Sequence, residues 1–128
     1  KMINIFMYTA VVLDERSQST LINEFMSKFP DWEIICHHMT INMKDAKQGP
    51  AFDLLGQEFK LVATHFAFDD KVAAVKVDTE VPSVKTLKHI TVAVNRKNGG
   101  KPSQSNSLSD WQPLPKPIIL YGTVQEVS

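Results

Sequence analysis

Two short segments of the chain share one pattern, in which a histidine is followed by an apolar residue, a threonine and another apolar residue. They read His38-Met39-Thr40-Ile41 and His89-Ile90-Thr91-Val92. Because successive side chains of a strand point to opposite faces, each histidine projects from the same face as its threonine. The apolar residue between them projects into the core, so each segment offers an imidazole beside a hydroxyl.

Two such pairs on neighbouring strands would supply the groups that in-line attack at phosphorus requires. One imidazole can remove a proton from water while the other protonates the leaving oxygen. The hydroxyls of Thr40 and Thr91 can donate hydrogen bonds to the non-bridging oxygens in the transition state. The alternative is that His38 and His89 are half-buried strand histidines and that the threonines reflect strand propensity alone. The repetition of the whole pattern favours catalysis.

Three other residues of reactive type lack this context. His37 is expected on the core face of its strand, with a structural role, and His65 is followed by Phe66 and Ala67 rather than by the pattern. Cys36 is expected on the same face as His38. We interpret it as an inert, half-buried thiol, because nothing nearby indicates a lowered thiol pKa.

A long segment without periodicity, residues 96–116, holds two adjacent glycines and three prolines and is predicted to be a loop. Asn106 and Trp111 are its candidate substrate-binding residues, because an amide can bind a base edge and an indole can stack on a base. The alternative is a flexible linker that Trp111 pins to the sheet. Tyr121 is a further candidate, as a donor to phosphate, and so is Lys76.

The periodicity of apolar residues predicts an α+β protein. One amphipathic helix should begin near Asp14 or Ser17 and end before Pro30. Antiparallel strands should form a sandwich that the helix covers on one face. The halves 3–43 and 72–127 each contain one His-x-Thr strand, which suggests a degenerate internal duplication with pseudo-twofold symmetry and a central cleft. The strands are expected at residues 3–13, 33–43, 59–68, 72–77, 88–95 and 118–127.

Composition limits the classes of function that remain. The 128 residues are ordinary in hydrophobic content and match one domain, residues 1–128. Equal numbers of basic and acidic residues, 14 of each, provide no general field for a long nucleic-acid backbone. The single cysteine excludes an internal disulfide and is typical of a reducing compartment, so we expect a cytoplasmic protein. We expect no membrane segment, and the oligomeric state is left open.

The two segments resemble the signature of the two-histidine (2H) phosphoesterase superfamily, in which His, apolar, Ser or Thr, apolar occurs twice on a pseudo-symmetric sheet. That superfamily includes cyclic phosphodiesterases, tRNA-ligase cyclic phosphodiesterase domains, 2′,5′-phosphodiesterases and phage enzymes that degrade cyclic-nucleotide signals. The compact layout is closest to RNA-repair or phage-type members. The spacing between the two motifs is shorter than in larger members, which leaves the subfamily and the substrate open.

The resemblance implies that His38 and His89 are general base and general acid, in an unassigned order, and that Thr40 and Thr91 hold the phosphate. It implies a metal-independent phosphodiesterase without a cofactor. The expected substrate is a nucleotide phosphodiester, such as a 2′,3′-cyclic phosphate RNA end or a 2′,5′-linked or cyclic oligonucleotide. One alternative is a non-catalytic module that sequesters a nucleotide in the same cleft, and another is an interaction domain without a ligand.

Overall fold

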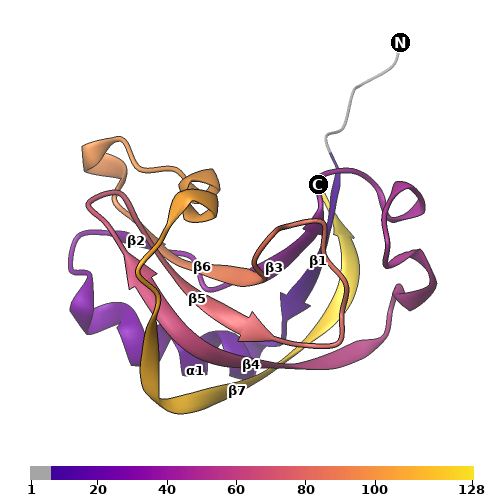
Figure 1. Ribbon diagram of the computed structural model, residues 1–128, viewed down its shortest axis with the longest axis horizontal. Coiled ribbons are helices and arrows are strands. Elements are labelled where there is room, and N and C mark those ends of the chain that lie inside the picture. The colour runs from indigo at the N-terminus through magenta and orange to yellow at the C-terminus, as the bar shows by residue number, and fades with distance from the viewer. Residues whose placement is uncertain (1–6) are drawn as a thin grey trace.

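The computed structural model describes residues 7–128, whose strands form one antiparallel sheet that closes into a barrel (Figure 1). The strands are β1 (Tyr8–Leu13), β2 (Glu33–Ile34), β3 (His38–Asn42), β4 (Glu58–Phe68), β5 (Val72–Asp78), β6 (His89–Val94) and β7 (Gln112–Val127). The helices are α1 (Glu15–Phe25) and the 3-10 turns η1 (Met26–Lys28), η2 (Ala46–Gln48), η3 (Phe52–Leu54), η4 (Arg96–Asn98) and η5 (Pro102–Ser107).

The barrel closes where β5 pairs with β6. The sheet order is β2-β6-β3-β1-β7-β4-β5, and the further pairing of β6 with β5, from Val72 opposite Val94 to Lys76 opposite His89, joins its two ends. The prediction of an α+β protein with antiparallel strands and one main helix is therefore confirmed. The prediction of a sandwich was wrong, because this non-local pairing leaves one continuous six-stranded ring with β2 as an added edge.

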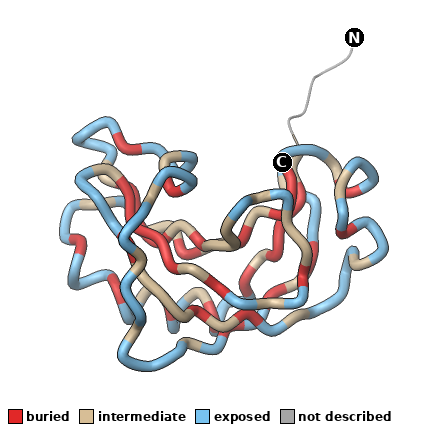
Figure 2. Tube along the Cα trace, viewed as in Figure 1, coloured by how far each residue is buried: buried red, intermediate tan, exposed pale blue. Residues whose placement is uncertain are grey.

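Helix α1 covers one side of the sheet and begins at a well-formed cap. Asp14 accepts a hydrogen bond from the backbone N–H of Ser17 at 2.7 Å, which satisfies one free donor of the first turn. Leu21 and Phe25 are fully buried against the strands, and buried residues concentrate along the strands in Figure 2. The α-helix ends at Phe25, earlier than predicted, and η1 completes the path to the buried Phe29.

The predicted strand 33–43 is interrupted at Cys36, whose φ of 47° lies in the left-handed region. Consequently β2 pairs with β6, whereas β3 pairs mainly with β1. The break interrupts the alternation of faces, and the Cys36 side chain is fully buried in the core, with Sγ 3.5 Å from the carbonyl oxygen of Val92. The prediction that Cys36 shares the face of His38 was therefore wrong.

Strand β7 begins at Gln112, inside the segment predicted to be a loop. Its first half, which holds the prolines, pairs only with β4, and pairing with β1 begins at Gly122. Proline is tolerated there because one side of this half-strand is an edge and needs no N–H donor. The prediction, which rested on proline content, therefore placed the start of the last strand too late.

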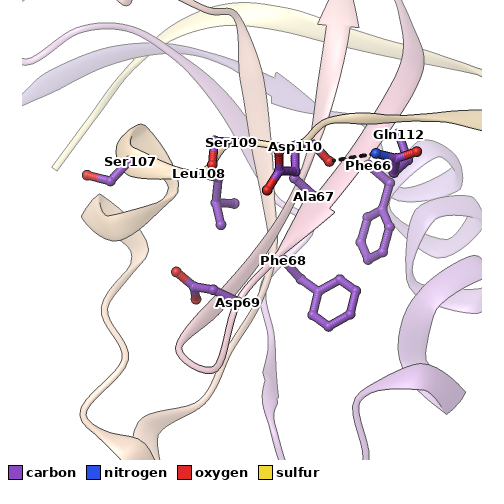
Figure 3. Close-up of a pocket in the computed structure, with 9 residues that line it drawn as sticks. All are labelled: Phe66, Ala67, Phe68, Asp69, Ser107, Leu108, Ser109, Asp110 and Gln112. Carbon is purple, nitrogen blue, oxygen red and sulfur yellow. Dashed lines mark hydrogen bonds between the residues drawn. The ribbon is translucent and has the colours of Figure 1, made fainter.

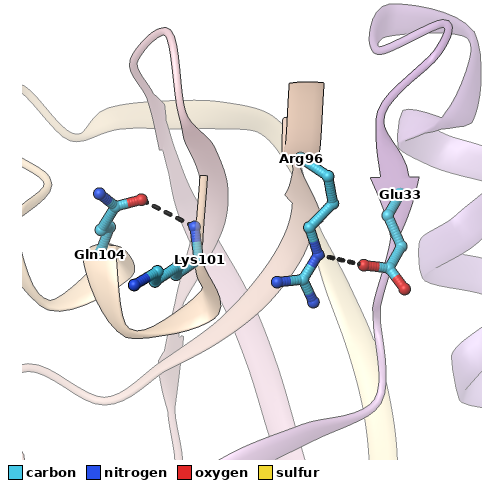
Figure 4. Close-up of polar contacts among 4 residues, drawn as sticks. All are labelled: Glu33, Arg96, Lys101 and Gln104. Atoms are coloured by element: carbon cyan, nitrogen blue, oxygen red, sulfur yellow. Dashed lines mark hydrogen bonds and ion pairs between the residues drawn. The ribbon is translucent and has the colours of Figure 1, made fainter. Parts of the chain in front are cut away.

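The remainder of that segment, before β7, is ordered by polar contacts (Figure 4). The Nε of Arg96 donates to a carboxylate oxygen of Glu33 at 2.6 Å, which ties η4 to β2. The Gln104 side chain accepts from the backbone N–H of Lys101 at 2.8 Å and thereby caps η5. Lys71 donates from Nζ to the carbonyl oxygen of Asn98 at 2.6 Å. These contacts fix η5 over one side of the barrel, opposite α1 (Figure 1).

The remaining predicted strands agree with the structure. Strands β4 and β5 form the expected hairpin, in which the Asp69 carboxylate accepts from the backbone N–H groups of Lys71 and Val72. The first predicted strand corresponds to β1 from Tyr8 onward, and its residues 3–6 lie outside the described residues. Within residues 7–128, no helix is both long and apolar enough to cross a membrane.

Candidate active site

One cavity of about 390 Å³ brings together the four residues of the two His-x-Thr segments. His38 and Thr40 enter it from β3, and His89 and Thr91 enter it from β6. Its walls also include Tyr8 from β1, Lys85 from the segment before β6, and residues of η5. The apolar partners of the motifs, among them Met39 and Ile90, are fully buried on the other side, as the strand period predicts.

The two motifs meet at a single cross-strand pair, Met39 opposite Ile90. In an antiparallel pair this register sets His38 against Thr91 and Thr40 against His89, which relates the two motifs by a local twofold axis. On the outer flanks, Thr40 pairs with Ala10 and Thr91 pairs with Ala74, and both alanines are fully buried. Paired residues share a face, so a small side chain lies beside each threonine.

His38 is packed against the rings of Tyr8 and His37. Its Nδ1 lies 3.0 Å from Nδ1 of His37, and its ring centroid lies 5.2 Å from that of Tyr8. Burial lowers the pKa of His38 to about 4, and the nearby charges of protonated His37 and His89 act in the same direction. His38 is therefore uncharged near neutral pH and able to accept a proton.

His89 has one nitrogen fixed by the backbone. Its Nδ1 lies 2.8 Å from the carbonyl oxygen of Leu87, and because a carbonyl only accepts, Nδ1 carries the proton. Burial lowers the pKa of His89, the bond to Leu87 partly opposes that shift, and the ammonium of Lys85 lowers the pKa further. The other nitrogen, Nε2, is left for a ligand in the cavity.

The two threonines differ in their surroundings. The hydroxyl of Thr91 lies 2.8 Å from that of Ser105, which is 2% exposed and belongs to η5. If Ser105 donates in this contact, the Thr91 proton is free to point to a ligand. At Thr40 the fixed group is the carbonyl oxygen, which accepts from the hydroxyl of Ser83 at 2.9 Å.

The segment between β5 and β6 holds Lys85 at the mouth of the cavity. The backbone N–H of Val84 donates to the carbonyl of Ile41 at 2.8 Å, and Ser83 bonds to the same stretch of β3. Lys85 is half-buried. Among the described residues that line the cavity, it is the one lysine, arginine, aspartate or glutamate. Periodicity along the chain did not indicate Lys85 or Ser105 as site residues, because both belong to segments without it.

The candidate substrate-binding residues have three different locations. Asn106 lines the cavity, and Trp111 lines a hollow directly beside it. Tyr121 is not brought to the cavity: it lines a separate hollow with Asp14 and Arg16, because the middle of β7 runs past the start of α1. A phosphate at the histidine pair is out of contact with that hollow.

His37 does not lie in the core, contrary to the prediction for its strand face. It is half-buried and contacts His38 with its ring nearly perpendicular, at an interplanar angle of 79°. The break at Cys36 explains this placement, because it shifts the alternation by which His37 and His38 would face opposite sides.

Another hollow, of about 370 Å³, is lined by the carboxylates of Asp69 and Asp110 together with Phe66 and Phe68 (Figure 3). No lysine, arginine or histidine lines it, so its charge disfavours a phosphate. Within residues 7–128 there is no group of three or more His, Cys, Asp or Glu side chains that could hold a metal ion.

A family model agrees with the position of these groups along the chain. The model of the fungal tRNA ligase phosphodiesterase domain matches residues 15–116. That range contains both His-x-Thr segments, Lys85 and η5. No curated protein and no solved structure matches the chain.

Proposed function

The chain belongs to the fungal tRNA ligase phosphodiesterase domain family, a family of cyclic phosphodiesterases, and from this premise we propose that it hydrolyses the 2′,3′-cyclic phosphate at an RNA end. One observation carries the proposal: two histidines and two threonines, related by the Met39–Ile90 pair, line one cavity of about 390 Å³. That volume suits a nucleotide, and the cavity lining includes Tyr8, Ile35, Met43 and Pro102, whose apolar surfaces can receive a base.

The two histidines take different roles because their surroundings differ. His38, with its pKa lowered to about 4, is neutral at working pH and acts as the general base. We assign His89 as the general acid: burial lowers its pKa too, but the Leu87 carbonyl fixes its Nδ1 proton and partly opposes that shift. Environments that separate the pKa values of two titratable groups assign base and acid in this way. The anionic substrate raises the pKa of both rings when it binds.

The hydrolytic step balances without any further reactant. Nε2 of His38 takes a proton from water as the water oxygen bonds to phosphorus, and the bond from phosphorus to one ribose oxygen breaks. His89 gives its Nε2 proton to that leaving oxygen. The product is a ribose phosphomonoester, and a proton returns from His38 to His89 through solvent.

The threonine hydroxyls stabilise the charge that develops on phosphorus. Thr40 and Thr91 donate to the two non-bridging oxygens from opposite strands, and Ser105 orients the hydroxyl of Thr91. We assign no metal to this step, since proton transfer and charge stabilisation are both provided by side chains.

The local twofold also supports an ancient duplication, in which β1, α1 and β3 correspond to β5, the segment 79–88 and β6. The second unit then lacks the counterpart of α1. A backbone of β5–β6 that cannot be superposed on that of β1–β3 would contradict this relation.

The experiment that tests the function is a substrate panel incubated with EDTA and resolved by mass spectrometry. It contains RNA ending in a 2′,3′-cyclic phosphate, cyclic mononucleotides, a cyclic oligonucleotide and 2′,5′-linked oligoadenylate. We expect the cyclic-phosphate RNA end to be opened to a phosphomonoester with the chelator present. Tight binding of that RNA without conversion would instead indicate a sequestering module, and loss of turnover with EDTA would contradict the metal-independent mechanism.

A further inference from the structure

A second hollow of about 390 Å³, the Trp111 hollow, opens directly beside the catalytic cavity. The two spaces share three wall residues, which are Lys85, His89 and Asn106. A ligand that reaches His89 from one space is therefore adjacent to the other. The proposed hydrolysis of a terminal cyclic phosphate uses only the first space and leaves this hollow without a role.

The Trp111 hollow has the chemistry of a nucleotide site. Its apolar wall consists of Trp111, Leu108, Leu87 and Val84, and Val84 is 61% exposed. An indole on such a wall offers a face on which any base can stack.

The polar side of the same hollow suits a phosphate and a base edge. Asn106 donates from Nδ2 to the carbonyl of Ser103 at 2.9 Å, which leaves its Oδ1 to accept from a base. Among the described residues that line the catalytic cavity or the Trp111 hollow, Lys85 is the one lysine, arginine, aspartate or glutamate. It lies on the wall that the two spaces share. A second phosphate is therefore best placed at this boundary.

We propose that the Trp111 hollow binds the nucleotide that precedes the terminal one, with its base on the indole and the connecting phosphate at Lys85. The inference rests on the proposed function and narrows its substrate class. The enzyme then acts on RNA ends of two or more nucleotides in preference to a cyclic mononucleotide.

The test compares two substrates with the same terminal base, a dinucleotide ending in a 2′,3′-cyclic phosphate and the corresponding cyclic mononucleotide. The parent should show at least about a tenfold higher kcat/KM for the dinucleotide. Trp111→Ala should reduce that ratio at least about fivefold, and Trp111→Phe should retain most of it because a ring remains. Lys85→Gln should reduce the ratio and also its dependence on salt.

Phe68→Ala is the matched control, since Phe68 is an aromatic ring that is 60% exposed and lies at the acidic hollow of Figure 3. It should leave the ratio unchanged. A parent that opens both substrates with equal kcat/KM, or a Trp111→Ala ratio equal to that of the parent, would overturn the subsite and leave the proposed function intact. A parent inactive on both substrates would instead overturn the proposed function.

A different observation concerns the contact behind His38. Nδ1 of His38 and Nδ1 of His37 lie 3.0 Å apart, so one proton is shared between them. His37 does not line the cavity, which leaves Nε2 of His38 as the nitrogen able to meet a ligand. The other titratable groups around His38 are Tyr8 from β1, His89 from β6 and Lys85 from the segment before β6.

We infer that His37 is a positioning residue that accepts the Nδ1 proton of His38. For a neutral His38 to take a proton at Nε2, its own proton must sit on Nδ1, and that N–H then donates to His37. As His38 becomes an imidazolium, the same bond stabilises the new charge, in the way an orienting group does for a catalytic histidine.

Nitrogen-15 NMR of the imidazoles tests this role without any turnover. The parent should show His38 with its proton on Nδ1, and His37→Phe should move the proton to Nε2 and reduce kcat about tenfold. His37→Asn should restore much of both, because its side-chain oxygen can accept the same hydrogen bond. A parent His38 protonated on Nε2, or a His37→Phe variant with the parent tautomer and pH profile, would overturn the inference.

Discussion

Strands β3 and β6 carry the same four-residue pattern and are related by a local twofold axis, yet they give their histidines different neighbours. On β3, His38 contacts two other rings and has its pKa lowered to about 4. On β6, burial also lowers the pKa of His89, but its bond to the Leu87 carbonyl partly opposes the shift. Backbone symmetry therefore brings two equivalent groups together, and neighbours outside the motifs make their surroundings differ, which is the basis of the proposed division into base and acid.

Removal of either histidine is the strongest challenge to this comparison. His38→Ala and His89→Ala should each reduce kcat on a cyclic-phosphate RNA end by about 10²- to 10⁴-fold, the usual contribution of general acid–base catalysis. His65→Ala is the control, because His65 lies on β4 outside the cavity and contacts Thr64. Steady-state kinetics at one pH measure all three variants, and near-parental turnover in either motif variant would defeat the assignment.

A substrate with a good leaving group separates the two roles. With a thymidine 4-nitrophenyl phosphodiester, the leaving phenolate needs no proton, so the loss in His89→Ala should shrink to about tenfold or less. The loss in His38→Ala should persist, because water must still be deprotonated. Release of the coloured phenolate gives the rates. If the loss shrinks in the His38 variant instead, base and acid are exchanged.

The sequence predicted the parts of this comparison that depend on local period. Alternation along two strands places His38 with Thr40 and His89 with Thr91 on one side, and the buried Met39 and Ile90 bear this out. The break at Cys36 was not predictable from period, because a positive φ at a residue other than glycine has no local signal in this sequence. His37 was misplaced for that reason.

Other features depend on contacts between distant segments. Closure of the barrel depends on the pairing of β5 with β6, which the period of either strand alone does not specify. Lys85 and Ser105 lie beside the motifs on segments that show no periodicity. Their positions are set by hydrogen bonds to β3 and β6 that no single segment reveals. The threonine that accompanies each histidine on its own strand could therefore be predicted, whereas the groups that distinguish the two histidines could not.

The contact of Thr91 with Ser105 is a smaller asymmetry between the strands. Ser105→Ala should reduce kcat by about tenfold, because Thr91 loses the donor that directs its own proton toward the phosphate, and KM should change less. Ser107→Ala lies in the same 3-10 turn, outside the catalytic cavity, and serves as its control. Equal kcat values for the two variants would show that Ser105 only fills space.

The smallest expected effect is on stability, and it isolates His38 without any substrate. The pKa of His38 is about 4 in the folded protein and near 6.5 when the chain is unfolded. Between these values the unfolded state binds the extra proton, so stability is complete above pH 6.5 and falls as the pH falls. When the pH falls from 7 to 6, the lowered pKa of His38 should decrease the free energy of unfolding by about 0.7 kcal/mol. That figure is nearly independent of how far the folded pKa lies below about 5.

Urea unfolding at both pH values gives the change in unfolding free energy between pH 7 and pH 6 for the parent and for His38→Gln. The difference between these two changes is the contribution of His38, because the other titrating groups cancel. The lowered pKa of His89 acts in the same direction in both proteins and remains in the variant. A variant with the same pH dependence as the parent would mean that His38 titrates normally in the folded state. A lowered pKa would then no longer distinguish His38 from His89, and the division into base and acid would have to arise only after the phosphate binds.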